Sequence, residues 1–301
     1  MLSLHHEVFL EVARLLSFTK AGQVLFLSQS AISKHIKSLE YHYKIGLFER
    51  HGNSISLTQA GQILYNKLLE ATQLKNELHH ELQHINENFL PPTKLAIGSS
   101  TTISLYVLPS VLSAYLREKP HLRLSVLNRN SDNIQTALLD HEIDVGIVEG
   151  LNRVNTLTYT PFTTDDVLIV CSKNSPLRNR ALTLKELLDI PLALRENGSG
   201  TLAVVENELL KQGVRLSDLT ILIRLGGTEA LKNFVLADTC PAFMPHRAIV
   251  RELATGDLVE VKIKGLSIQR TFHFIQRKGT ENNSQVNEFI RFTRSRYSKT
   301  D

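Results

Sequence analysis

Apolar residues in the first 57 positions recur at the spacing of short helices. Between residues 4 and 16 they return every three or four positions, which predicts an amphipathic helix. Thr19 is placed to cap a second helix over residues 20–25, and Ser28 is placed to cap a third over residues 29–43. The pattern therefore predicts three helices joined by tight turns.

A hairpin and a long helix are predicted next. Residues 47–57 predict two short strands around a turn at residues 51–53, and Thr58 is placed to cap a helix that ends at Pro91. A seven-residue repeat runs along this helix, with one polar exception, through Leu64, Leu68, Ala71, Lys75, Leu78, Leu82, Ile85 and Phe89. Such a seam favours a coiled-coil dimer, and the alternative is a helix that packs within its own chain.

From residue 94 the pattern alternates between strands and helices. The predicted strands cover residues 94–98, 122–127, 144–148, 167–171, 192–194, 219–225, 258–263 and 271–276. The predicted helices cover residues 103–116 (broken near Pro109), 131–139, 183–188, 201–212, 228–236 and 284–296. This alternation predicts parallel, doubly wound sheets.

The composition is that of an ordinary globular protein. The 301 residues are 42% hydrophobic and 21% charged, which excludes disordered and collagen-like chains and leaves room for about two domains. No apolar run approaches the ~20 residues of a membrane helix, and the first residues lack the pattern of an export signal. Two cysteines, Cys171 and Cys240, are too few for a disulfide framework. We expect a cytoplasmic protein with no membrane partner.

The net charge of +4 favours a polyanion partner only weakly. Residues 1–90 carry eight Lys and Arg and eight Glu, so a few locally placed cations would have to bind any nucleic acid. The predicted third helix supplies such a face, because hydroxyl, amide and lysine side chains that suit base edges and phosphates fall on one side of it. These residues are Gln29, Ser30, Ser33, Lys34 and Lys37.

The same region resembles the N-terminal signature of LysR-type transcriptional regulators. The matching stretches are FLEVA at 9–13, SFTKAG at 17–22, LSQSAISKHIKSLE at 27–40, IGLFER at 45–50 and ISLTQAG at 55–61. The resemblance extends over the whole chain. It implies a mixed fold: an N-terminal all-α winged helix-turn-helix domain, a long linker helix, and a C-terminal α/β two-lobed domain similar to periplasmic binding proteins.

The resemblance also implies domain bounds. The DNA-binding domain covers residues 1–58, the dimerising linker helix 59–90, and the effector-binding domain 93–301. Within the last, lobe I covers about 93–161 and 268–301, and lobe II about 162–267.

Carried over by motif, the DNA contacts are Arg50 at the wing and the exposed face of the third helix: Gln29, Ser30, Ser33, Lys34 and Lys37. Ser30 stands where the family has proline, Asn53 where the wing often has a cation, and Gly22 where alanine is usual.

Three loops rich in glycine and hydroxyl residues precede predicted helices in the two lobes, at residues 99–102, 197–201 and 226–228. Each offers backbone N–H groups and the positive end of a helix, which suit an anion, although ordinary helix capping needs the same residues. The resemblance places effectors between the lobes, at the first two of these loops. The candidate effector-binding residues are Ser99, Ser100, Thr102, Arg195, Ser199, Thr201 and Thr228.

Two charged residues near these loops leave alternatives open. Arg195 could pair with an anionic effector or form a surface ion pair. Glu149 follows a predicted strand and would oppose anion binding in the cleft unless it is paired. Residues 195–201 are similar to the same loop in regulators of sulfur assimilation and carbon fixation.

Other constellations carry no predicted chemistry. S-x-x-K at 17–20 and S-D-N at 131–133 lack the K-T-G of the serine acyl-enzymes, so we assign no catalytic residue and expect Ser131 to cap a helix. His80 and His84 have metal-binding spacing without a third ligand nearby, so we expect neither metal nor cofactor. Cys171 is expected to pack as a small hydrophobe, with a redox pair with Cys240 as the alternative.

We therefore predict a LysR-type regulator that binds double-stranded operator DNA and senses a small anionic metabolite. A homodimer through the linker helix, a tetramer built from two such dimers, and RNA polymerase as a further partner complete the prediction. The alternative is a two-lobed solute-binding protein or enzyme with an unrelated helical N-terminal domain.

Overall fold

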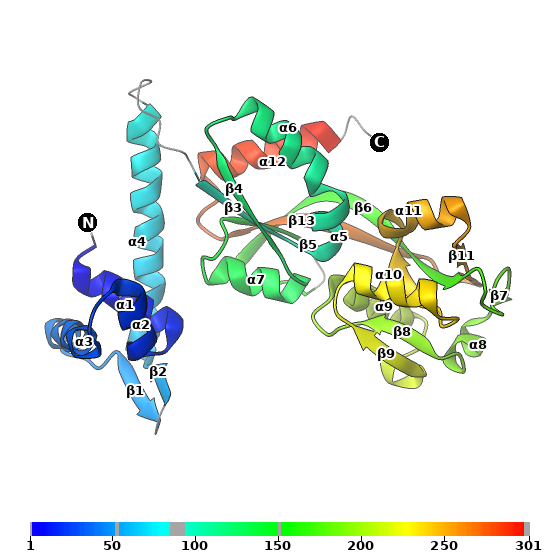
Figure 1. The fold of residues 1–301 in the computed structure, drawn as a ribbon, viewed down its shortest axis with the longest axis horizontal. Coiled ribbons are helices and arrows are strands. Elements are labelled where there is room, and N and C mark those ends of the chain that lie inside the picture. Colours follow the sequence, from blue (N-terminus) through cyan, green and yellow to red (C-terminus); the bar gives the residue numbers. More distant parts are fainter. Residues whose placement is uncertain (1, 52–53, 85–93, 150–151, 298–301) are drawn as a thin grey trace. The chain divides into compact units, whose positions relative to one another are not determined.

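The computed structural model describes residues 2–51, 54–84, 94–149 and 152–297. The chain divides into two compact units, Met1–Pro91 and Pro92–Asp301 (Figure 1). Among the residues the structure describes, no helix has the length and apolar character needed to span a membrane.

The N-terminal unit contains the three helices and the hairpin that the sequence predicts, followed by the long helix. Its elements are α1 (Leu4–Leu15), α2 (Phe18–Leu25), α3 (Gln29–Tyr43), β1 (Phe48–His51), β2 (Ser54–Leu57) and α4 (Gln59–His84). The predicted cap of α2 was wrong, because Ser17 and not Thr19 accepts the hydrogen bond from the Lys20 N–H, at 3.3 Å. Ser28 caps α3 as predicted.

The core of this unit also takes in the start of α4. Leu68 is 7% exposed within a cluster that the other elements build around Phe9 and Ile32, and Leu64 packs against it. The first part of the heptad seam is therefore used within the chain, contrary to the prediction. Leu78 is 53% exposed, so the seam opens to solvent further along. The seam positions Leu82, Ile85 and Phe89 lie outside the residues whose side chains are described.

The second unit is built around one large mixed sheet. Its strands are β3 (Lys94–Ser99), β4 (Arg123–Asn128), β5 (Val145–Glu149), β6 (Leu157–Ser172), β7 (Ala181–Leu182), β8 (Leu192–Arg195), β9 (Ile221–Leu225), β10 (Ala242–Pro245), β11 (Leu258–Glu260), β12 (Lys262–Ile263) and β13 (Ile268–Arg277). Its helices are α5 (Thr101–Tyr106), α6 (Leu108–Glu118), α7 (Ser131–Leu139), α8 (Leu184–Leu188), α9 (Gly200–Lys211), α10 (Thr228–Ala237), α11 (His246–Thr255), α12 (Ser284–Tyr297) and a 3-10 turn at Leu216–Asp218.

The two lobes share this sheet, whose order is β4-β3-β5-β13-β6-β10-β8-β9, with β11 paired to β6. Parallel strands form each end, as predicted. The centre departs from the prediction, because the long strands β6 and β13 pair antiparallel and run from one lobe into the other. Residues 157–166, which the sequence did not predict as strand, form the first part of β6.

Each lobe has its own apolar core on this sheet. Phe272 and Phe274 of β13 lie in one core with Ile97 and Phe289, and Ile268 at the start of β13 lies in the other. Figure 1 shows α6 and α12 together on one face of the first half of the sheet and α7 on the opposite face. Because β13 contributes apolar residues to both cores, its position between the lobes is fixed by packing on either side.

Candidate effector site and DNA-reading helix

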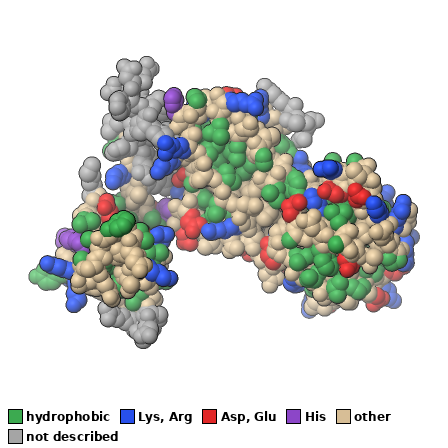
Figure 2. Space-filling view, viewed as in Figure 1, with side chains coloured by type: hydrophobic (Ala, Val, Ile, Leu, Met, Phe, Trp, Pro, Cys, Tyr) green, Lys and Arg blue, Asp and Glu red, His purple; other side chains and the backbone are tan. Residues whose placement is uncertain are grey.

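The third helix presents the polar face that the sequence predicts. Its buried face consists of Ile32, Ile36 and Leu39. The predicted contacts Gln29, Ser30, Lys34 and Lys37 are exposed, and Ser33 is half-buried. Arg50 lies in β1, and its side chain lies outside the described residues. In the face drawn in Figure 2, Lys and Arg side chains are scattered over the N-terminal unit and do not gather in one field.

Contacts within the unit fix the hairpin against α3. Glu40 near the end of α3 accepts hydrogen bonds from the N–H groups of Leu47 at 2.8 Å and Phe48 at 3.4 Å. Thr58 donates to the carbonyl of Gly46 at 2.7 Å and accepts from the N–H of Gly61 at 3.0 Å, which confirms it as the cap of α4. These hydrogen bonds join α3, the β1–β2 hairpin and the start of α4.

Gly22 departs from the family pattern for a steric reason. A Cβ atom at this position would lie 2.6 Å from the carbonyl oxygen of Leu27, which belongs to the turn before α3. The missing side chain lets α2 and this turn approach closely, and offsets the lower helix propensity of glycine.

In the second unit, candidate residues gather at the carboxyl ends of parallel strands from both lobes. The ends of β3 and β5 come from the first lobe, and the ends of β8 and β9 from the second. Three helices begin at these ends, α5, α9 and α10. This is where open α/β sheets bind ligands, because loops and helix N-termini converge there.

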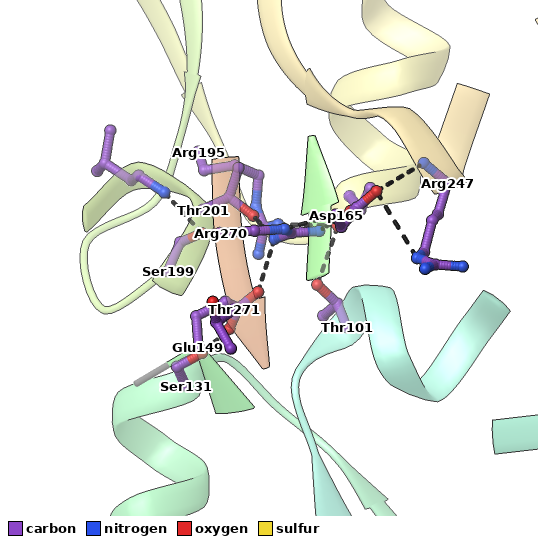
Figure 3. Close-up of polar contacts among 12 residues, drawn as sticks. Thr101, Ser131, Glu149, Asp165, Arg195, Ser199, Thr201, Arg247, Arg270 and Thr271 are labelled. Carbon is purple, nitrogen blue, oxygen red and sulfur yellow. Dashed lines mark hydrogen bonds and ion pairs between the residues drawn. The ribbon is translucent and has the colours of Figure 1, made fainter. Parts of the chain in front are cut away.

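Arg270 on β13 is the centre of the polar cluster in Figure 3. Its side chain has no exposed surface. One Nη donates to Glu149 and to Thr201, both at 2.7 Å, while the other Nη and the Nε donate to Asp165 at 2.7 and 3.2 Å. The guanidinium also lies over the ring of Phe272, 4.5 Å from its centroid. Four of its five N–H groups are thus hydrogen-bonded within the chain.

The sequence did not predict Asp165 or Arg270 as site residues. Both lie in the strands that cross between the lobes, and nothing in their spacing or neighbours sets them apart. Arg247 was also missed: its backbone N–H, at the start of α11, donates to Asp165 at 3.3 Å. The pairing of β6 with β13 brings Asp165 and Arg270 together, and the start of α11 adds Arg247.

The first and third predicted loops meet across the lobes. The hydroxyls of Thr101 and Thr228 are 3.0 Å apart. Ser100 and Thr102 are 3% and 1% exposed, and their hydroxyls have no hydrogen-bond partner within the described part of the chain. The Ser99 hydroxyl is 2.5 Å from that of Ser104. An unpaired buried hydroxyl costs about 1–3 kcal/mol of folding free energy. The hydroxyls of Ser100 and Thr102 are therefore strong candidates for ligand contacts.

The second loop is held by contacts within the chain. Ser199 caps α9 by accepting from the Leu202 N–H at 3.4 Å, and Thr201 accepts from Arg270. Ser131 was predicted to cap α7, but that prediction was wrong, because Asn130 accepts the hydrogen bond from the Asn133 N–H. The Ser131 hydroxyl is left to donate to Glu149.

Arg195 is paired within the chain and is not at the surface. It is 3% exposed, and its Nε and Nη2 donate to Glu196 at 2.8 and 2.9 Å. Its Nη1 donates to Thr228 at 2.8 Å. Burial acts to raise the pKa of Glu196, but the hydrogen bonds and charge of Arg195 outweigh it, and the pKa lies below its ordinary value.

Both cysteines are buried thiols. Cys171 is 0% exposed within the core of the second lobe, as predicted. Burial, together with the charge of Asp238, raises the pKa of Cys240 to about 11. The side chains of His80 and His84 lie outside the described residues.

Comparison with known proteins identifies the family of this chain. The family model "LysR substrate binding domain" matches residues 90–298, and "Bacterial regulatory helix-turn-helix protein, lysR family" matches residues 4–62. The chain belongs to the LysR family of transcriptional regulators. It is a DNA-binding regulator with an effector-binding domain and not an enzyme, which excludes the alternative of a solute-binding protein or enzyme.

One LysR relative is the "Uncharacterized HTH-type transcriptional regulator YeiE" of Escherichia coli K12, 30% identical over 284 residues that cover 94% of each chain. Solved structures with the same fold include full-length CbnR with its target DNA, at a TM-score of 0.63 and 19% identity, over 98% of this chain and 99% of that one. Another is the CcmR regulatory domain of Synechocystis in complex with 2-PG, at a TM-score of 0.59 and 22% identity, over 67% of this chain and 96% of that one.

Proposed function

We propose that this regulator senses a small anion held between its lobes and reads operator DNA as a homo-oligomer. The observation that carries the first part is the pair of buried hydroxyls on Ser100 and Thr102, which have no hydrogen-bond partner among the described residues. A ligand with acceptor oxygens would satisfy both. The starts of α5, α9 and α10 add positive potential on the same side. The complex of the CcmR domain with 2-PG supports a small ligand in this fold.

The proposed DNA contacts are Arg50 and the exposed face of α3: Gln29, Ser30, Ser33, Lys34 and Lys37. CbnR, of the same fold, has been solved with its target DNA. The proposed dimer forms through the exposed part of α4, where Leu74 is 66% and Leu78 53% exposed. A tetramer of two such dimers, and contact with RNA polymerase, extend the proposal.

A thermal-shift screen of sulfate, phosphate, small carboxylates and nucleotides tests the effector. A ligand at about 100 times its Kd should raise the free energy of unfolding by ~2.7 kcal/mol. Thr102→Val removes one unpartnered hydroxyl at nearly constant size and should abolish the response, whereas Thr136→Val, at an exposed position of α7, should keep it. Equal responses from both variants would move the ligand away from this loop, and a cationic or wholly apolar effector would contradict the anion.

A further inference from the structure

The carboxylate of Glu149 lies where the second predicted loop would hold an anion. Glu149 ends β5 in the first lobe, and its side chain is 3% exposed. It accepts hydrogen bonds from the Ser131 hydroxyl and from Arg270, the latter at 2.7 Å (Figure 3). Because it is paired in this way, the Glu149 carboxylate is not an isolated negative charge between the lobes.

The same carboxylate lies against the first turn of α9, in the other lobe. A Cβ atom added to Gly200, the first residue of α9, would lie 2.6 Å from Cδ of Glu149 and closer still to its Oε2. Gly200 does not have the left-handed backbone that calls for glycine. Its missing side chain therefore serves close approach, because the carboxylate fills the space that a Cβ would take.

These contacts are those of a bound anion. The start of α9, a twelve-residue helix, attracts negative charge through the helix dipole. Arg270 supplies a full positive charge, which it shares between Glu149 and Asp165, and the hydroxyls of Ser131 and Thr201 complete the surroundings. The donors Ser131 and Arg270 belong to the first lobe, and α9 of the second lobe packs against the carboxylate at Gly200, so an anion held here contacts both lobes.

We propose that Glu149 is a tethered anion: its carboxylate occupies the seat formed by Arg270 and the start of α9, and an effector anion must compete with it there. This inference rests on the proposed function, because it concerns the anion that the cleft would sense. The side chain would thereby set the effector concentration at which the lobes rearrange.

Chemical rescue tests the seat itself. Glu149→Ala removes the carboxylate from α9 and from one Nη of Arg270, which keeps its ion pair with Asp165. Sodium formate should therefore raise the Tm of the full-length variant in a saturable way. Wild type and Asp166→Ala, which removes an exposed carboxylate of β6, should respond to formate no more than to sodium chloride of equal ionic strength. A folded Glu149→Ala protein without saturable rescue would overturn the proposal.

A second pair of variants tests the seat without relying on rescue. Gly200→Ala should lower the Tm of wild type by pushing the carboxylate out, and should cost much less in the Glu149→Ala background. The Ser131 hydroxyl, 2.6 Å from the added Cβ, can rotate away once Glu149 is gone. Equal costs in the two backgrounds would show that the carboxylate is not what Gly200 accommodates.

Competition is measured by titrating sulfate and phosphate into wild type and Glu149→Gln. The variant should bind whichever anion the cleft takes at least tenfold more tightly. Equal or weaker binding by Glu149→Gln would overturn the competition, even with successful formate rescue. A third outcome is that formate rescue succeeds but neither protein binds any anion of the screen. The proposed anion sensing and the competition would then both be wrong, and only the anion site formed by Arg270 and α9 would be supported.

Discussion

At the scale of the residue, the charge and proton states of buried groups are set by their immediate partners. His273 of β13 is 7% exposed. Its Nδ1 lies 3.2 Å from the carbonyl of Thr271, and its Nε2 lies 3.4 Å from an Nη of Arg153. A carbonyl can only accept and a guanidinium can only donate, so the ring is neutral with its proton on Nδ1.

The stability of the second unit should depend on the proton state of His273. Burial, and then the charge of Arg153, lower the pKa of this histidine, against the opposing hydrogen bond to Thr271. A lowered pKa in the folded state means that the unfolded chain binds the proton more readily. The contribution to stability is therefore complete above the unfolded pKa of about 6.5 and is lost as the pH falls below it.

Urea unfolding of His273→Asn between pH 5.5 and 7.5 tests this dependence. Asn keeps a donor for Thr271 and does not titrate, so the variant should show a shallower rise of unfolding free energy with pH than wild type. His246→Asn, at an exposed position, is the control and should keep the wild-type slope. A His273→Asn slope as steep as that of wild type would contradict the prediction.

At the scale of the element, α3 and α4 each have one face buried in the chain's own core and one face exposed. In α3 the apolar face is buried and the polar face carries Lys34 and Lys37. In α4 the first turns complete the core of the N-terminal unit, and the later apolar positions Leu74 and Leu78 are exposed. Each helix therefore exposes one face to solvent, which is polar in α3 and apolar in α4.

Lys34→Ala should weaken operator binding by ~1–3 kcal/mol and relax specificity at one base pair, because we place Lys34 at a base edge. Fluorescence anisotropy on a selected operator and its single-base variants measures both effects. Lys67→Ala serves as control, since Lys67 is paired with Glu70 on α4. A uniform loss over all sequences would make Lys34 a phosphate contact, and an unchanged affinity would remove it from the interface.

Leu78→Asp should dissociate the proposed dimer, because a carboxylate buried in an apolar seam costs several kcal/mol. Analytical ultracentrifugation should then show a smaller species, which binds the operator poorly. Asn66→Asp, exposed on another side of the same helix, should stay at the wild-type mass. An undiminished mass for Leu78→Asp would mean that α4 does not carry the dimer contact through this residue.

At the scale of the whole molecule, the second unit is two lobes on one sheet. The strands β6 and β13 pass between the lobes, and β13 contributes apolar residues to both cores. Between the lobes, Lys232 of α10 contacts Tyr106 of α5, with its Nζ 3.3 Å from the phenol oxygen. The lobes are thus joined by two shared strands, by polar contacts and by the packing of Tyr106 against the apolar core of the second lobe.

Most elements could be predicted because local patterns dominate them. Residues 29–43 and 131–139 form helices with the predicted bounds, since their caps and apolar spacing lie within a few residues. The start of β6 was missed because residues 161–166 are largely polar, and its strand pairing comes from β13, about a hundred residues away. Helix α11 was missed because only Ala248 and Ile249 are buried, which leaves a weak periodic signal.

The sequence by itself determined the family, the helix-turn-helix with its exposed residues, and the loops that precede α5, α9 and α10, because motif and capping signals are local. Only the tertiary structure decided how the buried charges beside these loops are paired. Glu149 and Arg270 are 121 positions apart, and they meet because β5 and β6 flank β13 in the sheet. Burial then makes each charge dependent on its partner, and no pattern along the chain records which partner that is.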